Sequence, residues 1–352
     1  MTDEHTDDAS VSSDPIVGAR IEKHRAAVAT GVYPYRFDRT DLAADLHMRY
    51  DELGPGGETG VETTVAGRLM HVRDMGRLAF GVLQDVSGRI QLFASKAVLG
   101  SEGFARFLDL DSGDWIGATG EIIATKKGEL SVRVSSVTLL AKALRPLPDK
   151  WHGLKDVEAR SRQRYIDLMV NEESRRVALT RAKIIAELRR QFEDRGFIEV
   201  ETPVLLAQAT GATARPFETH HNALDLDLSM RIATELFLKR LVVGGIERVF
   251  EIGRIFRNEG VDSTHNPEFT MLEAYQALAD YGDIMELLEE VIAGVAVSAV
   301  GAATITYQGR LLDLTPPFRR VRLVDLVADA VGEAVSLDMP MERLRALASR
   351  HG

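Results

Sequence analysis

Residues 248–275 read RVFEIGRIFRNEGVDSTHNPEFTMLEAY, and this stretch decides the architecture of the second half of the chain. Two strand-like runs, 247–256 and 267–276, enclose a polar turn. Because successive side chains of a strand point to opposite faces, Arg257 and Glu259 are expected to share a face. The returning strand presents its own set on one face, which comprises Phe269, Met271, Glu273 and Tyr275. The pattern predicts a hairpin that gathers a guanidinium, carboxylates, an aromatic ring and a phenol on one patch.

That patch suits a ligand with a triphosphate, a flat base and a charged amine. An arginine grips phosphate or carboxylate through two parallel hydrogen bonds. A phenylalanine ring can stack on a base, and carboxylates pair with ammonium groups. A solvated, charged surface ribbon is the simpler interpretation. It explains poorly why acids and arginine alternate with Phe269 and Met271 inside a long apolar stretch.

The order of these residues resembles a known signature. Arg257 and Glu259 form the run fRxE, and His265 and Phe269 form HxxxF after the turn. Together they resemble the second signature motif of class II aminoacyl-tRNA synthetases. The flanking residues are similar to the lysine-specific family of that class, the lysyl-tRNA synthetases, and the likeness extends over 15–330. The resemblance implies ATP-dependent activation of lysine and its transfer to tRNA(Lys), with Mg²⁺ accompanying ATP and with a homodimer as the assembly.

The resemblance also assigns the nucleotide side of the site. Arg257 matches the catalytic residue that bridges the substrate carboxylate and the α-phosphate, so it belongs to both the ATP and the lysine sites. Glu259 and His265 match the positions that hold the adenine and the triphosphate, and Phe269 matches the aromatic residue under the adenine. Asn266, next to His265, is a further candidate for the ATP site.

Lysine requires an anion at each amino end. By the same resemblance Glu235 matches the residue that receives the α-amino group, whereas Glu273 and Tyr275 match residues near the ε-ammonium. A buried carboxylate without its ammonium is costly, so such a pocket rejects neutral side chains. Gly211 lies in TGATARPF (210–217), which matches a mobile loop that closes over the substrate. Taken alone, Glu235 is equally explained as an acid favoured by the dipole of a helix N-terminus.

Residues 61–141 read as five short strands with an intervening helix, 101–108. This pattern suggests an OB-type barrel, a fold that binds single-stranded nucleic acid on one face. A bare scaffold barrel is the alternative. The resemblance matches Arg73, Phe80 and Gln91 to the positions that read the anticodon, with Phe80 stacked on a base. The alternative for Phe80 is a core aromatic residue.

The second half mixes helices with hairpins, and this favours an antiparallel sheet flanked by helices over βαβ units. No GxGxxG or GxxxxGK[ST] phosphate loop occurs in the sequence. The fold class is therefore predicted to be α+β, with an OB-fold barrel followed by a class II synthetase sheet. The expected domains are an acidic, disordered tail (1–14), an N-terminal helix plus barrel (15–145) and a catalytic domain (146–352). The expected elements of the catalytic domain are helices at 155–170, 174–195, 231–244 and 280–299, strands at 197–200 and 222–230, and a hairpin at 304–314.

The composition of the chain limits the possible number of domains, the chemistry of the site and the kinds of partner. The 352 residues suit two domains, and the lack of cysteine excludes disulfides and Cys-ligated zinc. A net charge of −10 argues against nucleic-acid binding unless basic residues cluster. Arg20, Lys23, His24 and Arg25 form such a cluster on a predicted helix, for which a solvated face is the alternative. The polar start lacks signal-peptide features, and the longest apolar run, 291–303, is too short to span a bilayer, so we expect a cytoplasmic protein without a membrane partner.

This sequence departs from the family pattern in one respect. The third class II motif, a glycine-rich strand and helix with a catalytic arginine, has no match before Gly352. The acidic magnesium ligands of the family are expected beyond that residue, so no metal ligand is assigned within the chain. We expect residues 1–352 alone to show little aminoacylation, and a non-catalytic tRNA-binding or dimer-forming remnant is the alternative function. An aspartate or asparagine ligase is a further alternative, against which Glu235 and Glu273 argue.

Overall fold

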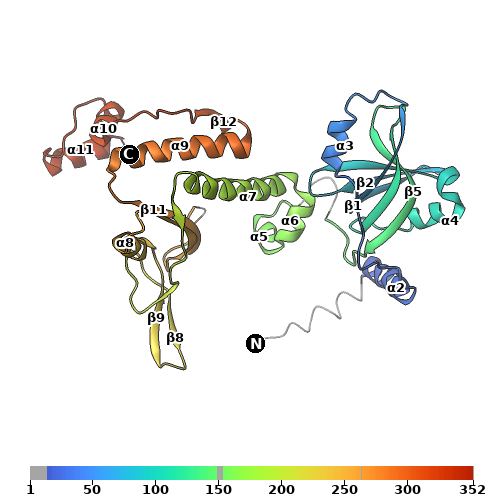
Figure 1. The fold of residues 1–352 in the computed structure, drawn as a ribbon, viewed down its shortest axis with the longest axis horizontal. Coiled ribbons are helices and arrows are strands. Elements are labelled where there is room, and N and C mark those ends of the chain that lie inside the picture. Colours follow the sequence, from blue (N-terminus) through green and yellow to red (C-terminus); the bar gives the residue numbers. More distant parts are fainter. Residues whose placement is uncertain (1–13, 149–153, 263, 352) are drawn as a thin grey trace. The chain divides into compact units, whose positions relative to one another are not determined.

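The computed structural model describes residues 14–148, 154–262 and 264–351, which form two compact units divided between Glu172 and Glu173 (Figure 1). Each unit has its own cluster of buried hydrophobic residues. The acidic tail expected at 1–14 lies outside the described residues except for Asp14. The Asp14 carboxylate accepts hydrogen bonds from the first main-chain N–H groups of the following helix and so caps it.

The first unit is built on a closed barrel of five strands in the order β1-β2-β3-β5-β4. Neighbouring strands are antiparallel except for β3 and β5, which are parallel. A helix connects β3 to β4, so the predicted OB-type barrel is confirmed. The elements are β1 (Glu58–Asp74), β2 (Leu78–Gln84), β3 (Arg89–Ser95), α4 (Lys96–Leu108), β4 (Trp115–Ala124) and β5 (Leu130–Ala141).

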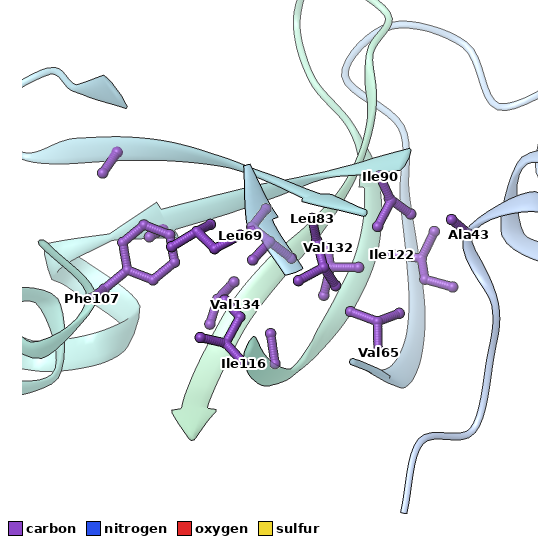
Figure 2. Packing of buried hydrophobic residues seen from close by; sticks show 14 of the residues in the cluster. Ala43, Val65, Leu69, Leu83, Ile90, Phe107, Ile116, Ile122, Val132 and Val134 are labelled. Atoms are coloured by element: carbon purple, nitrogen blue, oxygen red, sulfur yellow. The ribbon is translucent and has the colours of Figure 1, made fainter. Parts of the chain in front are cut away.

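The barrel interior is filled by branched aliphatic side chains from every strand, with Phe107 of α4 at one end (Figure 2). Phe107 is fully buried, and burying such a side chain contributes about 1.5–3 kcal/mol. A short helix, α3 (Ala43–Arg49), closes the barrel with Ala43 and Leu46. The inward-facing residues of the strands therefore form a hydrophobic core inside the barrel. The buried set seen in Figure 2 includes Val65, Leu69, Leu83, Ile90, Ile116, Ile122, Val132 and Val134.

The N-terminal helix α2 (Pro15–Ala29) docks on the barrel through basic side chains. Arg20 is 7% exposed and donates from Nη1 to two main-chain carbonyls of the segment 143–145. Lys23 lies 3.2 Å from the carboxylate of Asp111. The solvated face was a wrong prediction for Arg20, which is buried. Contact of this basic cluster with nucleic acid stays a prediction.

The predicted helix at 155–170 is two short helices, α5 (Val157–Arg162) and α6 (Arg164–Val170). The chain breaks at Gln163, whose φ of −109° and ψ of 51° are not helical. The break lets arginines from both helices, Arg160 and Arg164, pair with the fully buried Asp167. A buried carboxylate needs such compensation.

A three-stranded sheet in the order β11-β10-β6 centres the second unit. Strands β10 (Arg248–Phe256) and β11 (Glu268–Gln276) are antiparallel, as the hairpin pattern predicts. The short strand β6 (Ile198–Glu199) pairs with β10 in parallel, so the sheet is antiparallel only in part. A long helix, α7 (Glu172–Glu193), precedes β6.

The two faces of this sheet differ in character. One face packs Phe250, Ile252 and Leu272 against Phe192 of α7 and against the helix α9 (Tyr281–Val300). The other face carries the alternate residues of both strands. Residues directly opposite each other in an antiparallel ladder share a face. The opposed pairs on this second face are Val249 with Tyr275, Glu251 with Glu273, Gly253 with Met271, and Ile255 with Phe269.

The strand expected at 222–230 and the helix expected at 231–244 are both shorter than predicted. The strand expected at 222–230 is β9 (Leu226–Met230), which forms a hairpin with β8 (Glu218–His221). The helix expected at 231–244 is α8 (Glu235–Val243). It begins late because Arg231 uses its main chain in tertiary hydrogen bonds, from its N–H to Val204 and from the Phe256 N–H to its carbonyl. The remaining elements are β7 (Leu205–Leu206), β12 (Thr304–Tyr307), β13 (Arg310–Asp313), α10 (Leu323–Val331) and α11 (Met341–His351).

Within the described ranges, none of the helices combines the length and the apolar character needed to cross a membrane.

Candidate functional site

Glu273 and Tyr275 lie on the polar face of β11 and bond to each other. The Tyr275 hydroxyl donates to Glu273 Oε2 at 3.1 Å, and the main-chain N–H of Thr234 donates to Glu273 Oε1 at 3.1 Å. Burial raises the pKa of Tyr275 well above its usual value, and the charges of Glu273 and Glu235 raise this pKa further. The phenol therefore stays a neutral donor, which holds the Glu273 carboxylate in place.

Glu235 is the first residue of α8 and lies beside this pair. Its Oε1 is 2.5 Å from Lys239 Nζ, one helical turn along, and this ammonium is 5.7 Å from the centre of the Tyr275 ring. The surroundings of Glu235 and Tyr275 thus accommodate an amino group by charge and by a ring face. The sequence reasoning missed Lys239, although an acid and a lysine four residues apart on a helix are a recognised pair.

Gly211 brings the loop 210–217 against Glu235. Its φ is +88°, which favours glycine. A Cβ at this position would lie 3.1 Å from the Cβ of Ala233 and 3.3 Å from the Cβ of Glu235. The same loop contacts the turn after β10, because the Asn258 N–H donates to the Arg215 carbonyl at 2.7 Å. The loop therefore touches both regions to which the resemblance assigns substrate contacts.

Arg257 follows β10 directly and lies against Phe269. Its main-chain N–H donates to Pro267 at 2.8 Å, and its guanidinium carbon is 5.3 Å from the centre of the Phe269 ring. Nε and Nη2 donate to the Ile232 carbonyl at 3.4 and 3.3 Å. Because β10 ends at Phe256, Arg257 and Glu259 both lie beyond the strand, and strand alternation does not determine their faces. Glu259 lies in the turn. There its carboxylate accepts from the Arg215 N–H at 3.4 Å.

The turn that carries His265 is organised by Asp262. One Asp262 oxygen accepts from the main-chain N–H groups of Thr264 and His265, and the other lies 2.8 Å from His265 Nδ1. Hydrogen bonds from the Thr264 N–H and hydroxyl, and then from His265, hold the pKa of Asp262 well below its usual value. Within the described part of the turn, the His265 ring forms hydrogen bonds with Asp262 and with the Thr264 hydroxyl. Asn266 is exposed beside it.

The structure thus brings together two sets of predicted residues on one side of the sheet. Arg257 with Phe269 is one set, and Glu235, Glu273 and Tyr275 with Gly211 form the other. The segment 231–234 links the sets, because its main chain bonds both Arg257 and Glu273. Among the described residues, no group of three or more His, Cys, Asp or Glu side chains is arranged to hold a metal ion.

The barrel presents a second candidate surface. Arg73, Phe80 and Phe93 lie in one row across β1, β2 and β3. The rings of Phe80 and Phe93 meet edge to face at a centroid distance of 5.5 Å. Phe80 is half-buried and lies outside the barrel core, so the core interpretation of this residue was wrong. Gln91 lies on the neighbouring row, where its Oε1 accepts from the Ser131 hydroxyl at 2.9 Å.

Phe93 is a residue that the sequence reasoning missed. It stands two positions after Gln91 on the same strand, so period-2 alternation already put it on the same face. Two aromatic rings and an exposed guanidinium on a barrel face are what single-stranded nucleic acid binding requires.

Comparison with known proteins covers both units. Residues 156–349 match the family described as tRNA synthetases class II (D, K and N). Residues 63–140 match the family described as an OB-fold nucleic acid binding domain.

The curated proteins that this chain resembles include several lysine–tRNA ligases. The chain is 50% identical over 339 residues to a lysine–tRNA ligase of Enterococcus faecalis, covering 94% of this chain and 68% of that protein. It is 53% identical to a lysine–tRNA ligase of Prochlorococcus marinus, covering 89% of this chain and 65% of the relative. The Bacillus subtilis lysine–tRNA ligase is 49% identical, with 91% and 65% covered. The chain spans about two thirds of the length of the curated relatives it matches.

Proposed function

Because the chain belongs to the lysine–tRNA ligase family of class II tRNA synthetases, we propose that it activates lysine with ATP and transfers the lysyl group to tRNA(Lys). One observation carries the choice of amino acid. Two carboxylates, Glu235 and Glu273, lie beside the phenol of Tyr275 on the face of the sheet that also carries Arg257. A substrate with one carboxylate and two ammonium groups complements these charges, whereas an acidic side chain would meet carboxylates.

In this proposal Glu235 receives the α-ammonium, and Glu273 with Tyr275 receives the ε-ammonium. Glu273 is already oriented by the Thr234 N–H and the Tyr275 hydroxyl, so little ordering is needed when the substrate binds. An uncharged side chain of similar length leaves the Glu273 carboxylate without its cation, and that penalty gives the selectivity. The loop around Gly211 covers the substrate from the opposite side.

The activation step joins two anions. A carboxylate oxygen of lysine attacks the α-phosphorus of ATP, an O–P bond forms, and the bond from that phosphorus to the pyrophosphate oxygen breaks. Arg257 bridges the carboxylate and the α-phosphate, which neutralises both as they approach. Phe269 supports the adenine ring, and Glu259, His265 and Asn266 hold the base and the triphosphate. Mg²⁺ would enter with ATP and neutralise the charge of its phosphates.

The barrel supplies recognition of the tRNA. In our proposal Phe80 stacks on an anticodon base, Arg73 and Gln91 bond to base edges, and Phe93 extends the stacking surface. The terminal ribose hydroxyl of the tRNA then attacks the lysyl carbonyl carbon, and AMP leaves. A homodimer and a cytoplasmic location are part of the same proposal and rest on the family alone.

The test is lysine-dependent exchange of pyrophosphate into ATP, together with lysine binding by calorimetry. Glu235→Gln should weaken lysine binding about 10- to 100-fold, since a hydrogen bond to a charged group contributes about 1.5–3 kcal/mol. The matched control is Glu268→Gln on β11, which alternates to the other face and pairs with Arg254 at 3.3 Å. Lysine binding that is unchanged in Glu235→Gln would remove this residue from the site.

A second candidate function, a non-catalytic tRNA-binding remnant, is favoured by one observation. The barrel closes on itself and has a complete core of its own, so anticodon binding does not depend on the catalytic unit. The two functions separate when anticodon stem-loop binding is measured beside lysine binding on the same preparation. Tight, anticodon-dependent binding without any binding of lysine or ATP would support the remnant and overturn the ligase proposal.

A further inference from the structure

A buried guanidinium lies on the same face of the sheet as the proposed lysine site. Arg231 is 4% exposed. Its Nη1 lies 2.5 Å from Glu251 Oε1, and its Nε donates to the main-chain carbonyl of Arg254 at 2.8 Å. Thr202 completes the group, because its carbonyl accepts from Nη1 at 3.1 Å and its hydroxyl donates to Glu251 Oε2 at 2.6 Å. Both charges of the pair are compensated, which a buried ion pair requires.

The strand below is shaped for this guanidinium. A Cβ on Gly253 would lie 2.2 Å from Arg231 Nη2 and 3.0 Å from Glu251 Oε1. The Arg231 guanidinium is held by Glu251, Thr202 and Arg254, so it cannot easily move away from a contact under 3 Å. A methyl group at position 253 therefore has no room. A glycine is therefore needed at position 253, because the Arg231 guanidinium packs directly against β10.

The Arg231 contacts anchor the segment 231–234, which serves both ends of the proposed substrate. The carbonyl of Ile232 accepts from Arg257 Nε and Nη2, and the N–H of Thr234 donates to Glu273 Oε1. In the proposed function Arg257 takes the lysine carboxylate and Glu273 takes the ε-ammonium. One short segment therefore holds the two groups that must match the length of the substrate.

We propose that Arg231 is a positioning residue that sets the distance between Arg257 and Glu273 and thereby selects the chain length of the diamino acid. This inference rests on the proposed function. A lysine side chain at 231 has one point charge and cannot reproduce the forked contacts to Glu251, Thr202 and Arg254 together. The segment 231–234 then loses its anchor, and the spacing of the two substrate-binding groups is no longer fixed.

The experiment measures the dissociation constants of lysine and of ornithine, which is one methylene shorter, by calorimetry on the full chain. The wild-type protein should prefer lysine by at least about tenfold, since one methylene is worth about 10- to 200-fold in a fitted pocket. Arg231→Lys should weaken lysine binding about tenfold and ornithine binding much less, so that the preference collapses; a small misplacement of substrate-binding groups has effects of this size.

Two variants that keep both charges of the Arg231–Glu251 pair cover the case in which Arg231→Lys does not fold. Gly253→Ala displaces the guanidinium without removing a charge, and Thr202→Val removes only the hydroxyl that orients Glu251. Both should lower the lysine-to-ornithine preference. The matched control is Arg189→Lys, which alters the pair of Arg189 with Glu199 on the neighbouring strand, at 2.9 Å, without touching 231–234. Its preference should stay at the wild-type value.

The outcomes separate the two levels of the argument. If the wild-type chain binds lysine and the variants weaken lysine and ornithine by the same factor, Arg231 is merely structural and this inference is overturned. If the wild-type chain binds neither ligand, the proposed function fails and the inference falls with it. A lower preference in all three variants and an unchanged one in the control supports the role of Arg231.

Discussion

Glu251 and Glu273 face each other directly across β10 and β11, yet their partners differ in charge. Glu251 pairs with the buried Arg231, whereas Glu273 bonds to the neutral Thr234 N–H and Tyr275 hydroxyl. Like charges directly opposite in a sheet repel. Arg231 therefore neutralises one acid of the pair, and the negative charge that is left over lies on the acid assigned to the substrate.

The same substitution at these two positions should affect different properties of the protein, stability at Glu251 and lysine binding at Glu273. Glu251→Gln leaves Arg231 as a buried, unpaired cation and should lower the free energy of unfolding by about 3–5 kcal/mol. Glu273→Gln should change stability far less, because it removes repulsion, but should weaken lysine binding about 10- to 100-fold. Urea unfolding and calorimetry with lysine measure the two effects. Equal stability losses at both positions would contradict the assignment of the surplus charge to Glu273.

Gly211 gives a prediction about the closing loop. Gly211→Val adds a branched side chain at a φ of +88°, where the Cβ alone would meet Ala233 and Glu235. A strained backbone of this kind costs about 1–3 kcal/mol, which should appear as a loss of lysine affinity of about 5- to 100-fold. Global stability should change less, because the loop can move away from Glu235. The control is Gly260→Ala, at a position where a Cβ meets nothing within 4 Å.

The aromatic pair on the barrel gives a prediction about RNA. Phe80→Ala and Phe93→Ala should each weaken binding of the anticodon stem-loop of tRNA(Lys), by about 1–3 kcal/mol for each base that loses its stacking partner. Fluorescence anisotropy on the full chain measures this loss, and a stem-loop with an altered anticodon tests specificity. Wild-type affinity in both variants would remove the Phe80–Phe93 row from the RNA surface.

The barrel and the hairpin could be predicted from the sequence because both depend on patterns of residues that lie close together along the chain. The strands are indicated by alternating apolar residues, by turn residues and by the run fRxE. None of these signals requires knowledge of distant contacts. They also fix which residues of β11 share a face, and Glu273 and Tyr275 do so as predicted. The roles of those residues as ligands stay predictions.

What the sequence could not predict depends on tertiary contacts. Residues 231–234 have helical propensity, but their main chain is bound by Val204 and Phe256, so α8 starts at Glu235. The residues next to Arg231 in the sequence do not indicate that it is buried against Gly253, because its hydrogen-bond partners lie 20 to 29 residues away. Arg20 and Lys23 looked like a basic face until the docking of α2 became visible. Charge patterns alone do not show which charges are satisfied inside the protein.

Asp85 links the β2–β3 turn to the N-terminus of α3 and gives a prediction about pH. Its Oδ1 accepts from the N–H groups of Ser87 and Gly88, and its Oδ2 accepts from the Ala43 N–H at 2.7 Å. Burial opposes the charge, but hydrogen bonds from Ser87, Ala43 and Gly88 outweigh it and hold the pKa of Asp85 below its usual 3.8. Asp85→Asn retains one acceptor oxygen and loses the bond to Ala43.

The sign of the pH effect follows from the lowered pKa. When folding lowers the pKa of a carboxyl group, its charge stabilises the fold fully at any pH above the pKa of the group in the unfolded chain. This contribution is lost as the pH falls through the pKa of the group in the folded protein. At pH 7 Asp85→Asn should therefore unfold about 1–3 kcal/mol more easily than the wild type. The difference should hold down to about pH 5 and shrink below 3.8. The control is Asp38→Asn, which removes an exposed carboxylate paired with Arg36 and should change the stability at pH 7 very little. A gap between Asp85→Asn and wild type that widens in acid would show that the charge of Asp85 is not what stabilises this corner of the barrel.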